Sequence, residues 1–382
     1  MKVFTIALLI SARVLTAGEP ERKPALWAPR DYQVFQRVSQ TQGKVDFALV
    51  DLAVRADSAQ YKFTGKPLDG ELQSDWKDFD PDIDGALMSS KFTVPAGGWY
   101  KFEVRFLNKG KSVFETSVEH VGVGEVFVIA GQSNSTNHGS EKQTTASGMV
   151  ASFDGKAWQL ANDPQPGIQD KSSGGSFAPA FGDALYEKYK VPIGIVSTGA
   201  GATSVRQWLP KGERMSNPPT IESHVKKIED GVWESTGDLF EGLMKRVNAL
   251  GKNGFRAILW HQGESDAGQA RGGYPAIKQI SGAQYAEFMG KLIKASRERA
   301  GWEIPWFTAQ ATYHSEKDAA DEEFRAAQKS LWEKGVAFEG PDTDALGKEY
   351  RAGVHFNAKG LQAHGKMWAE KVSGYLDKAL EK

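Results

Sequence analysis

The chain has 382 residues, a length that predicts two or three domains. Its 47 Lys and Arg nearly balance its 48 Asp and Glu, so it lacks the concentrated basic charge typical of nucleic-acid-binding proteins. The sequence contains no cysteine, which excludes disulfide scaffolds, thiol nucleophiles and cysteine-based metal sites. An ordinary hydrophobic content of 40% excludes wholesale disorder.

Residues 1–18 have the pattern of an export signal. Lys2 supplies a positive charge, residues 3–10 form a short apolar run, and residues 15–17 (LTA) provide a cleavage site. The apolar run is too short to span a bilayer, and no later segment approaches that length. Arg13 interrupts the pattern, and the alternative is a buried N-terminal strand. We expect an exported protein, periplasmic or extracellular, with no membrane span.

Residues 25–122 predict a small β-sandwich domain. Short segments at 31–38, 45–54, 91–94 and 99–107 are rich in β-branched and aromatic residues, and several alternate with a period of two. Turn-forming residues, including the run PAGG at 95–98, separate them.

Residues 123–382 predict an α/β domain. Continuous apolar runs at 125–130, 192–197, 255–260 and 304–309 are typical of strands that are covered on both faces. Helical stripes lie between and after them, at 239–250, 285–293 and 361–372, and Gly251 ends the first stripe. Strands that alternate with helices predict a parallel sheet with helices on both faces.

Polar, glycine-rich clusters follow the predicted strands. They lie at residues 131–134, 198–204 and 261–266, and a fourth cluster at 354–357 precedes the last helix. Because ligands of open parallel sheets bind outside the carboxyl ends of the strands, we expect these clusters to meet at one edge.

Ser133 and His355 are the candidate nucleophile and base. A serine on a tight turn after a buried strand can expose its hydroxyl, and a histidine can take its proton. The alternative for Ser133 is a helix N-cap. His138 and His261 are further histidines in or near these clusters, and each can equally be structural.

The sequence leaves open which carboxylate is the third catalytic residue. A catalytic histidine needs a carboxylate to hold its tautomer, and Glu264, Asp266, Asp342 and Asp344 are candidates. Each can instead be a solvated charge or a helix cap.

No cofactor or metal is expected. The GAGATS run at 199–204 is an imperfect dinucleotide fingerprint, and Gly201 is better interpreted as a backbone N–H donor to negative charge. The sequence has no H-E-x-x-H motif, no phosphate-binding P-loop and no G-x-S-x-G elbow.

These clusters resemble the SGNH hydrolase superfamily, and within it the sialate O-acetylesterase-like group that includes carbohydrate esterase family six. The matching stretches are VFVIAGQSN at 126–134, GAGATSVRQW at 199–208, WHQGE at 260–264 and VHFN at 354–357. The resemblance covers roughly residues 124–380 and implies an SGNH-type, flavodoxin-like sheet. It also implies Ser133 as nucleophile and His355 as base, with an oxyanion hole formed by the N–H groups of Ser133 and Gly201 and the side chain of Gln262.

Two positions depart from the family pattern. Most SGNH hydrolases have an aspartate three residues before the histidine, where this chain has Ala352. In the family-six-like branch the glutamate of HQGE is thought to take over, which points to Glu264. Ala202 stands where relatives often have glycine.

The resemblance therefore predicts a serine esterase that removes O-acetyl groups from a carbohydrate: sialate, xylan or another acetylated polysaccharide. Asn134, Trp208 and His261 are candidate substrate-binding residues. One alternative is a non-catalytic carbohydrate-binding protein on a hydrolase scaffold. Another is a lipase-like or thioesterase-like SGNH hydrolase, which needs a long apolar acyl groove.

Overall fold

The computed structural model describes residues 24–52, 55–271 and 275–381. They fall into two compact units, one ending at Gly124 and one beginning at Glu125, and strand β10 (Lys111–Gly131) contributes to both. The expected export signal at residues 1–18 lies outside the described residues. Within the described ranges, no helix combines the length and the apolar character needed to cross a membrane.

The first unit contains two sheets. One is antiparallel with the strand order β1-β3-β8-β7, and the other is built around β4, β9 and the first part of β10. In the second sheet only β2 pairs in parallel, with β10. The bounds are β1 Ala25–Ala28, β2 Gln33–Gln36, β3 Gln42–Val50, β4 Ser58–Pro67, β5 Leu72–Gln73, β6 Lys77–Phe79, β7 Asp82–Asp84, β8 Leu87–Pro95 and β9 Gly97–Asn108.

Aromatic side chains form the core of this unit. Strand β3 buries Val45, Phe47 and Leu49, and the residues between them are more exposed, as a period of two requires. The Phe47 ring lies 5.5 Å from Phe79 and 6.2 Å from Phe102, both in the other sheet. The inward faces of the two sheets therefore meet in aromatic contacts.

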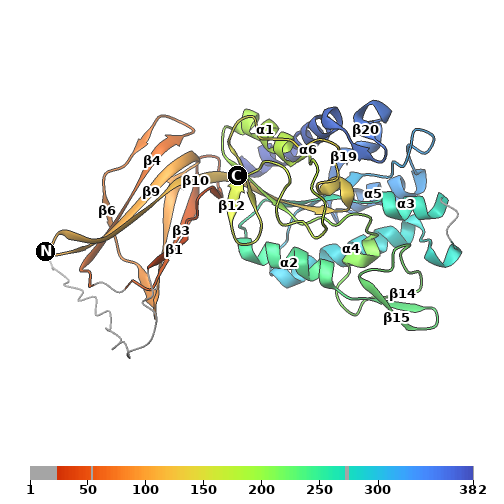
Figure 1. Cartoon of the computed structure of the whole chain (residues 1–382), viewed down its shortest axis with the longest axis horizontal. Coiled ribbons are helices and arrows are strands. Elements are labelled where there is room, and N and C mark those ends of the chain that lie inside the picture. The colour runs from red at the N-terminus through yellow and green to blue at the C-terminus, as the bar shows by residue number, and fades with distance from the viewer. Residues whose placement is uncertain (1–23, 53–54, 272–274, 382) are drawn as a thin grey trace. The chain divides into compact units, whose positions relative to one another are not determined.

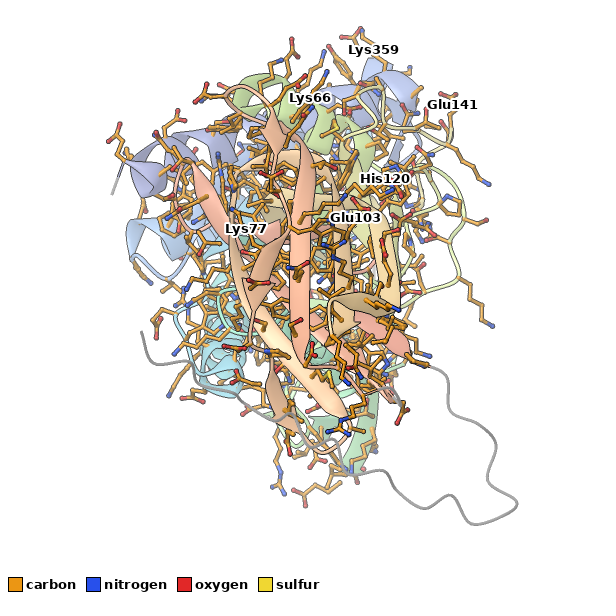
Figure 2. All side chains as sticks on the ribbon, turned by 90° about the vertical axis from the view of Figure 1, so that its left-hand side faces the viewer. Lys66, Lys77, Glu103, His120, Glu141 and Lys359 are labelled. Carbon is orange, nitrogen blue, oxygen red and sulfur yellow. The ribbon has the colours of Figure 1, made fainter. Side chains whose placement is uncertain are left out.

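The outward face of β4 and β9 is polar. Lys62 and Glu103 are cross-strand partners, and their charged groups lie 2.9 Å apart. The Arg105 guanidinium lies 4.1 Å from the centre of the Trp76 ring. Figure 2 shows Glu103 and His120 on the side of this unit that is turned to the viewer.

A mixed sheet with helices forms the second unit, which gives the chain an α/β fold. The strand order is β12-β11-β13-β10-β17-β18-β19, and only the edge strand β12 is antiparallel. The four predicted buried runs correspond to β10, β13, β17 and β18. The bounds are β11 Val150–Phe153, β12 Trp158–Leu160, β13 Ile193–Ser197, β17 Ala257–His261, β18 Trp306–Gln310 and β19 Phe338–Asp342.

Helices cover both faces of this sheet. In Figure 1, α1 and α6 lie above the sheet and α2 and α4 below it. Helix α2 ends at Leu250 with Gly251 as its C-cap, and Asn357 caps the start of α6 by accepting a hydrogen bond from the Gly360 N–H. The bounds are α1 Ala178–Tyr189, α2 Asp238–Leu250, α3 Glu264–Arg271, α4 Gly282–Ala300, α5 Glu322–Glu333 and α6 Ala358–Leu380.

Short elements complete the second unit. Two of them are small sheets, and the remainder are single turns of 3₁₀ helix. The bounds are β14 Arg214–Met215, β15 Val225–Glu229, β16 Val232–Ser235, β20 Arg351–Ala352, β21 His355–Phe356, η1 Ser133–Ser135, η2 Val205–Trp208, η3 Ala276–Lys278, η4 Thr343–Ala345 and η5 Lys348–Tyr350.

Gly131 is required where β10 and β17 run closest. Its φ is +125°, and a Cβ placed on it would lie 2.1 Å from the carbonyl oxygen of His261.

We predict that Gly131→Ala lowers the free energy of unfolding by at least about 2 kcal/mol, because the backbone of β17 blocks the methyl group. Gly290→Ala is the control, since Gly290 is helical with open space at its Cβ, and it should be neutral or stabilising. Equal denaturation midpoints for the two variants would contradict this account.

Candidate active site

A pocket of about 250 Å³ lies at the carboxyl ends of the parallel strands. Its lining comes from the loops that follow β10, β13, β17 and β18 and from the β20–β21 hairpin. The four predicted polar clusters all contribute to it, and the loop after β18 is an addition that the sequence did not predict. The lining residues are Gln132, Ser133, Asn134, His138, Ala202, Glu264, Ser265, His314, Val354 and His355.

Ser133 lines this pocket and lies on a turn that side-chain hydrogen bonds stabilise. Strand β10 ends at Gly131, and η1 begins at Ser133, which is 6% exposed. The Thr136 hydroxyl donates to the Ser133 carbonyl, and the Ser135 hydroxyl donates to the Gln132 carbonyl. Neither the hydroxyl nor the N–H of Ser133 has a hydrogen-bond partner among the described residues. Both groups are therefore available to a ligand.

His355 reaches the same pocket from the β20–β21 hairpin. Its cross-strand partner is Ala352, the position where the family pattern has aspartate. Burial is the largest cause that lowers the pKa of His355, and together with the charges of the neighbouring His138 and Arg351 it brings that pKa to about 4. The His355 imidazole is thus neutral over most of the ordinary pH range.

Glu264 lines the pocket without bonding to His355. Its Oε1 accepts a hydrogen bond of 2.9 Å from Asn134, and it lies 3.6 Å from Nδ1 of His261. Within the described ranges, no hydrogen bond joins the His355 ring to any carboxylate. The predicted contact between Glu264 and His355 is therefore not formed in this structure.

The other candidate acids accept hydrogen bonds from groups outside the pocket. Asp266 is fully buried, where it accepts from the Ser204 hydroxyl and the Val205 N–H. Asp344 accepts from the Thr312 N–H and hydroxyl and from Arg325. Neither residue lines the pocket.

Asp342 also pairs with Arg325, at 2.8 Å, and is absent from the pocket lining as well. The three aspartates that the sequence offered as candidate triad acids are therefore all bonded to groups outside the pocket.

Two of the three predicted oxyanion donors are already bonded. The Gly201 N–H donates to Asp170 at 2.6 Å. The Gln262 side chain is fully buried, and its N–H groups face Asp266 at 2.7 Å and the Thr203 carbonyl at 3.1 Å. Both donors therefore already have acceptors inside the protein.

Ala202 is a pocket residue that the sequence did not identify as a donor. It adopts a left-handed conformation with φ +57°, and its N–H has no acceptor in the part of the chain that the structure describes. Glycine adopts a positive φ at lower cost than alanine does.

Trp208 and His261, predicted to bind substrate, do not line the pocket. Trp208 is fully buried, packs at 5.2 Å on the Trp260 ring, and donates to the Thr203 hydroxyl. His261 is also fully buried, and its Nε2 lies 2.9 Å from the Thr343 hydroxyl. Both expectations are corrected for the same reason: these large side chains fill the core beneath the loops. Asn134, the third predicted residue, does line the pocket.

Two further histidines line the pocket. The His138 ring centre lies 4.9 Å from that of His355, and its Nε2 lies 3.3 Å from Asp170. Nε2 of His314 bonds to the Glu264 carbonyl at 2.5 Å. His138 follows Ser133 by five residues on one loop, a proximity visible in the sequence, whereas nothing in the sequence marks His314.

The chain belongs to the carbohydrate esterase, sialic acid-specific acetylesterase family, whose model matches residues 123–374. This match covers more than half of the chain and confirms the family predicted from the motifs. The protein is a carbohydrate O-acetylesterase. No curated protein sequence matches it.

The chain is similar to solved structures at low sequence identity, and the first of them shares its fold. A carbohydrate acetylesterase from Xanthomonas citri is similar at 17% identity with a TM-score of 0.53, over 91% of this chain and 74% of that one. An Arabidopsis thaliana protein is similar at 18% identity with a TM-score of 0.44, over 66% of this chain and 98% of that one.

The lowered pKa of His355 predicts activity that persists into acid. With His355 as the predicted base, which must be neutral to accept a proton, kcat/KM should fall only as the pH drops through about 4, instead of through the 6.5 of free histidine. The measurement is the pH profile of kcat/KM on a chromogenic acetate. A half-maximal value near pH 6.5 would show that the surroundings of His355 differ from those described.

Proposed function

We propose that this carbohydrate O-acetylesterase works through an acyl-enzyme, with Ser133 as nucleophile and His355 as base. The observation that supports this most strongly is that both residues line one pocket while the Ser133 hydroxyl has no partner among the described residues. His355 is neutral near pH 7, the state that a base requires.

The reaction proceeds in two steps. The Ser133 oxygen attacks the acetyl carbonyl while His355 takes the hydroxyl proton, and His355 then returns a proton to the departing sugar oxygen. Water next attacks the acetyl-serine ester, and His355 takes a proton from that water. Collapse of the second intermediate releases acetate and returns the proton to the Ser133 oxygen.

The oxyanion donors we propose are the N–H groups of Ser133 and Ala202. Both residues line the pocket, and neither N–H has an acceptor in the described ranges. Two such donors stabilise the charge of a tetrahedral intermediate, and loss of one typically costs about 10²–10³-fold in rate. The donors first predicted at Gly201 and Gln262 would serve only after their bonds to Asp170 and Asp266 break.

The pocket favours a short acyl group on a polar alcohol. Its volume of about 250 Å³ is below the usual range for small-molecule sites, and its lining residues include three histidines, Gln132, Asn134 and Glu264. This small volume fits an O-acetyl group on a sugar better than a long acyl chain. The similar Xanthomonas citri enzyme is a carbohydrate acetylesterase. We propose sialate, xylan or another acetylated polysaccharide as the substrate class.

We also infer finer features of the fold. The order β13-β10-β17-β18-β19 of parallel strands supports an SGNH-type, flavodoxin-like catalytic domain over residues 123–382. The facing aromatic contacts of the two N-terminal sheets support a β-sandwich over residues 25–122.

Residues 1–18 remain our proposal for an export signal, on their charge and apolar pattern alone. Expression of the full chain with its own N-terminus should yield exported protein that begins after residue 17 or 18. N-terminal sequencing of that fraction checks this, and uncleaved protein held inside the cell would contradict it.

Ser133→Ala should abolish acetyl-ester hydrolysis because it removes the attacking oxygen. The expected loss is at least about 10⁴-fold in kcat, with an unchanged circular dichroism spectrum, because the hydroxyl bonds to no described residue. The measurement is acetate release from an acetylated xylan and from O-acetylated sialic acid. Residual turnover near that of the native enzyme would refute the assignment, and a native chain that binds these glycans without turnover would favour a carbohydrate-binding role.

A further inference from the structure

We infer that Glu264 is a positioning residue, which acts through Asn134 to hold the loop of Ser133 against the hairpin of His355. This inference rests on the function proposed above. It replaces a direct contact between Glu264 and His355 with an indirect one, through three residues that we call the clamp: Glu264, Asn134 and Val354.

The Asn134 amide connects two distant parts of the chain. Its Nδ2 donates to Oε1 of Glu264 at 2.9 Å and to the Val354 carbonyl at 3.2 Å. Asn134 follows the nucleophile directly, and Val354 directly precedes the base. The two hydrogens of one amide group therefore fix how far Ser133 lies from His355.

Arg351 holds the Val354 carbonyl from the other side. Its Nη1 donates to that oxygen at 2.9 Å, and its guanidinium lies 4.1 Å from the ring centres of both Tyr313 and Phe356. Because Arg351 fixes the hairpin, a change at Asn134 alters the position of the Ser133 loop relative to an anchored His355.

The surroundings of Glu264 suit a neutral acceptor better than an anionic triad acid. The Thr343 hydroxyl donates its hydrogen to the Gln310 carbonyl, so it accepts from the Nε2–H of His261. Nδ1 of His261 is then a bare acceptor, 3.6 Å from Glu264. Burial raises the pKa of Glu264 to about 7, in line with a carboxyl group that is protonated in acid.

No carboxylate among the described residues forms a hydrogen bond or ion pair with the His355 ring, and the charged groups that act on this ring are basic. His138 and Arg351 are its basic neighbours, and His314 and Glu264 line the same pocket. Asp170 reaches His355 only by way of His138. Among the described residues, two bonds link the segments of the nucleophile and the base: the clamp, and the bond from the Ser140 N–H to the Phe356 carbonyl at 3.1 Å. The clamp is the one formed by the immediate neighbours of Ser133 and His355.

Glu264→Gln separates the two roles of this side chain. The glutamine Oε1 can still accept from Asn134, and its amide can donate to the bare Nδ1 of His261, so the clamp survives. We expect kcat to stay within about tenfold of the native value, whereas Glu264→Ala should lower kcat by about 10²-fold with little change in KM, because a misplacement of about 1 Å has that cost. A triad acid would instead lose about 10⁴-fold on amidation.

Asn134→Ala and the double variant complete the test on acetyl-ester substrates. Asn134→Ala should match Glu264→Ala, and the double variant should lose no more than either one, because both remove the same link. Asn134→Ala also keeps the test open if Glu264→Ala fails to fold. Glu349→Ala removes an exposed glutamate that pairs with Lys359, and this control should keep native activity.

Three results would overturn the clamp. The first is a loss of kcat in Glu264→Gln as large as in Glu264→Ala, and the second is a double variant whose loss of kcat is the product of the two single losses. The third is native kcat in both alanine variants. The test applies once Ser133→Ala has been shown to abolish turnover of the native enzyme. Without that dependence it is the proposed function that fails, and the clamp is then overturned with it.

Discussion

Parallel pairing of β10 with β13 on one side and β17 on the other is the constraint on which the site depends. Gly131 and His261 are partners in this register, and the chain leaves both strands at the same edge. Three loops that are far apart in sequence are thereby forced together. The close approach at Gly131 excludes any side chain, so the turn that presents Ser133 is fixed by the backbone.

The His355 imidazole is neutral, and nearby carboxylates bond to other groups of the protein instead of to this ring. Carboxylates are present nearby, yet Asp266 and Asp344 bond to backbone N–H groups and to arginines, and Asp170 bonds to Gly201 and Ser172. Buried carboxylates need such partners, because an unpaired charge inside a protein is costly. As a result, their charges are compensated within the scaffold, and His355 remains without an anionic neighbour in bonding range among the described residues.

The sequence predicted the elements whose burial is either continuous or regularly periodic. Apolar runs identified β10, β13, β17 and β18, and three- and four-residue spacing identified α2, α4 and α6. It missed β19, an edge strand with an exposed Phe338 and Pro341 inside it, because such a strand has no continuous apolar run. It also missed α1, whose Pro179 and Gly182 look like helix breakers, although Pro179 occupies the first turn.

Motifs located the pocket but not the direction of its side chains. Ser133, Asn134, Glu264 and His355 line it, whereas Trp208, His261 and Gln262 point into the core from the same motifs. Side-chain direction after a strand depends on local φ and ψ, such as the left-handed Ala202, and no pattern of residue types encodes it. The bond from Asn134 to Val354 spans 220 positions and arises only from the fold.

The most direct test of the central claim is covalent labelling of the pocket. A fluorophosphonate, which reacts preferentially with activated serine hydroxyls, should add one phosphonyl group to the native chain, and peptide mass spectrometry should place it on Ser133. His355→Ala should abolish the labelling. An adduct on another serine, or acetyl-ester turnover that continues in a chain whose Ser133 is fully labelled, would contradict the account.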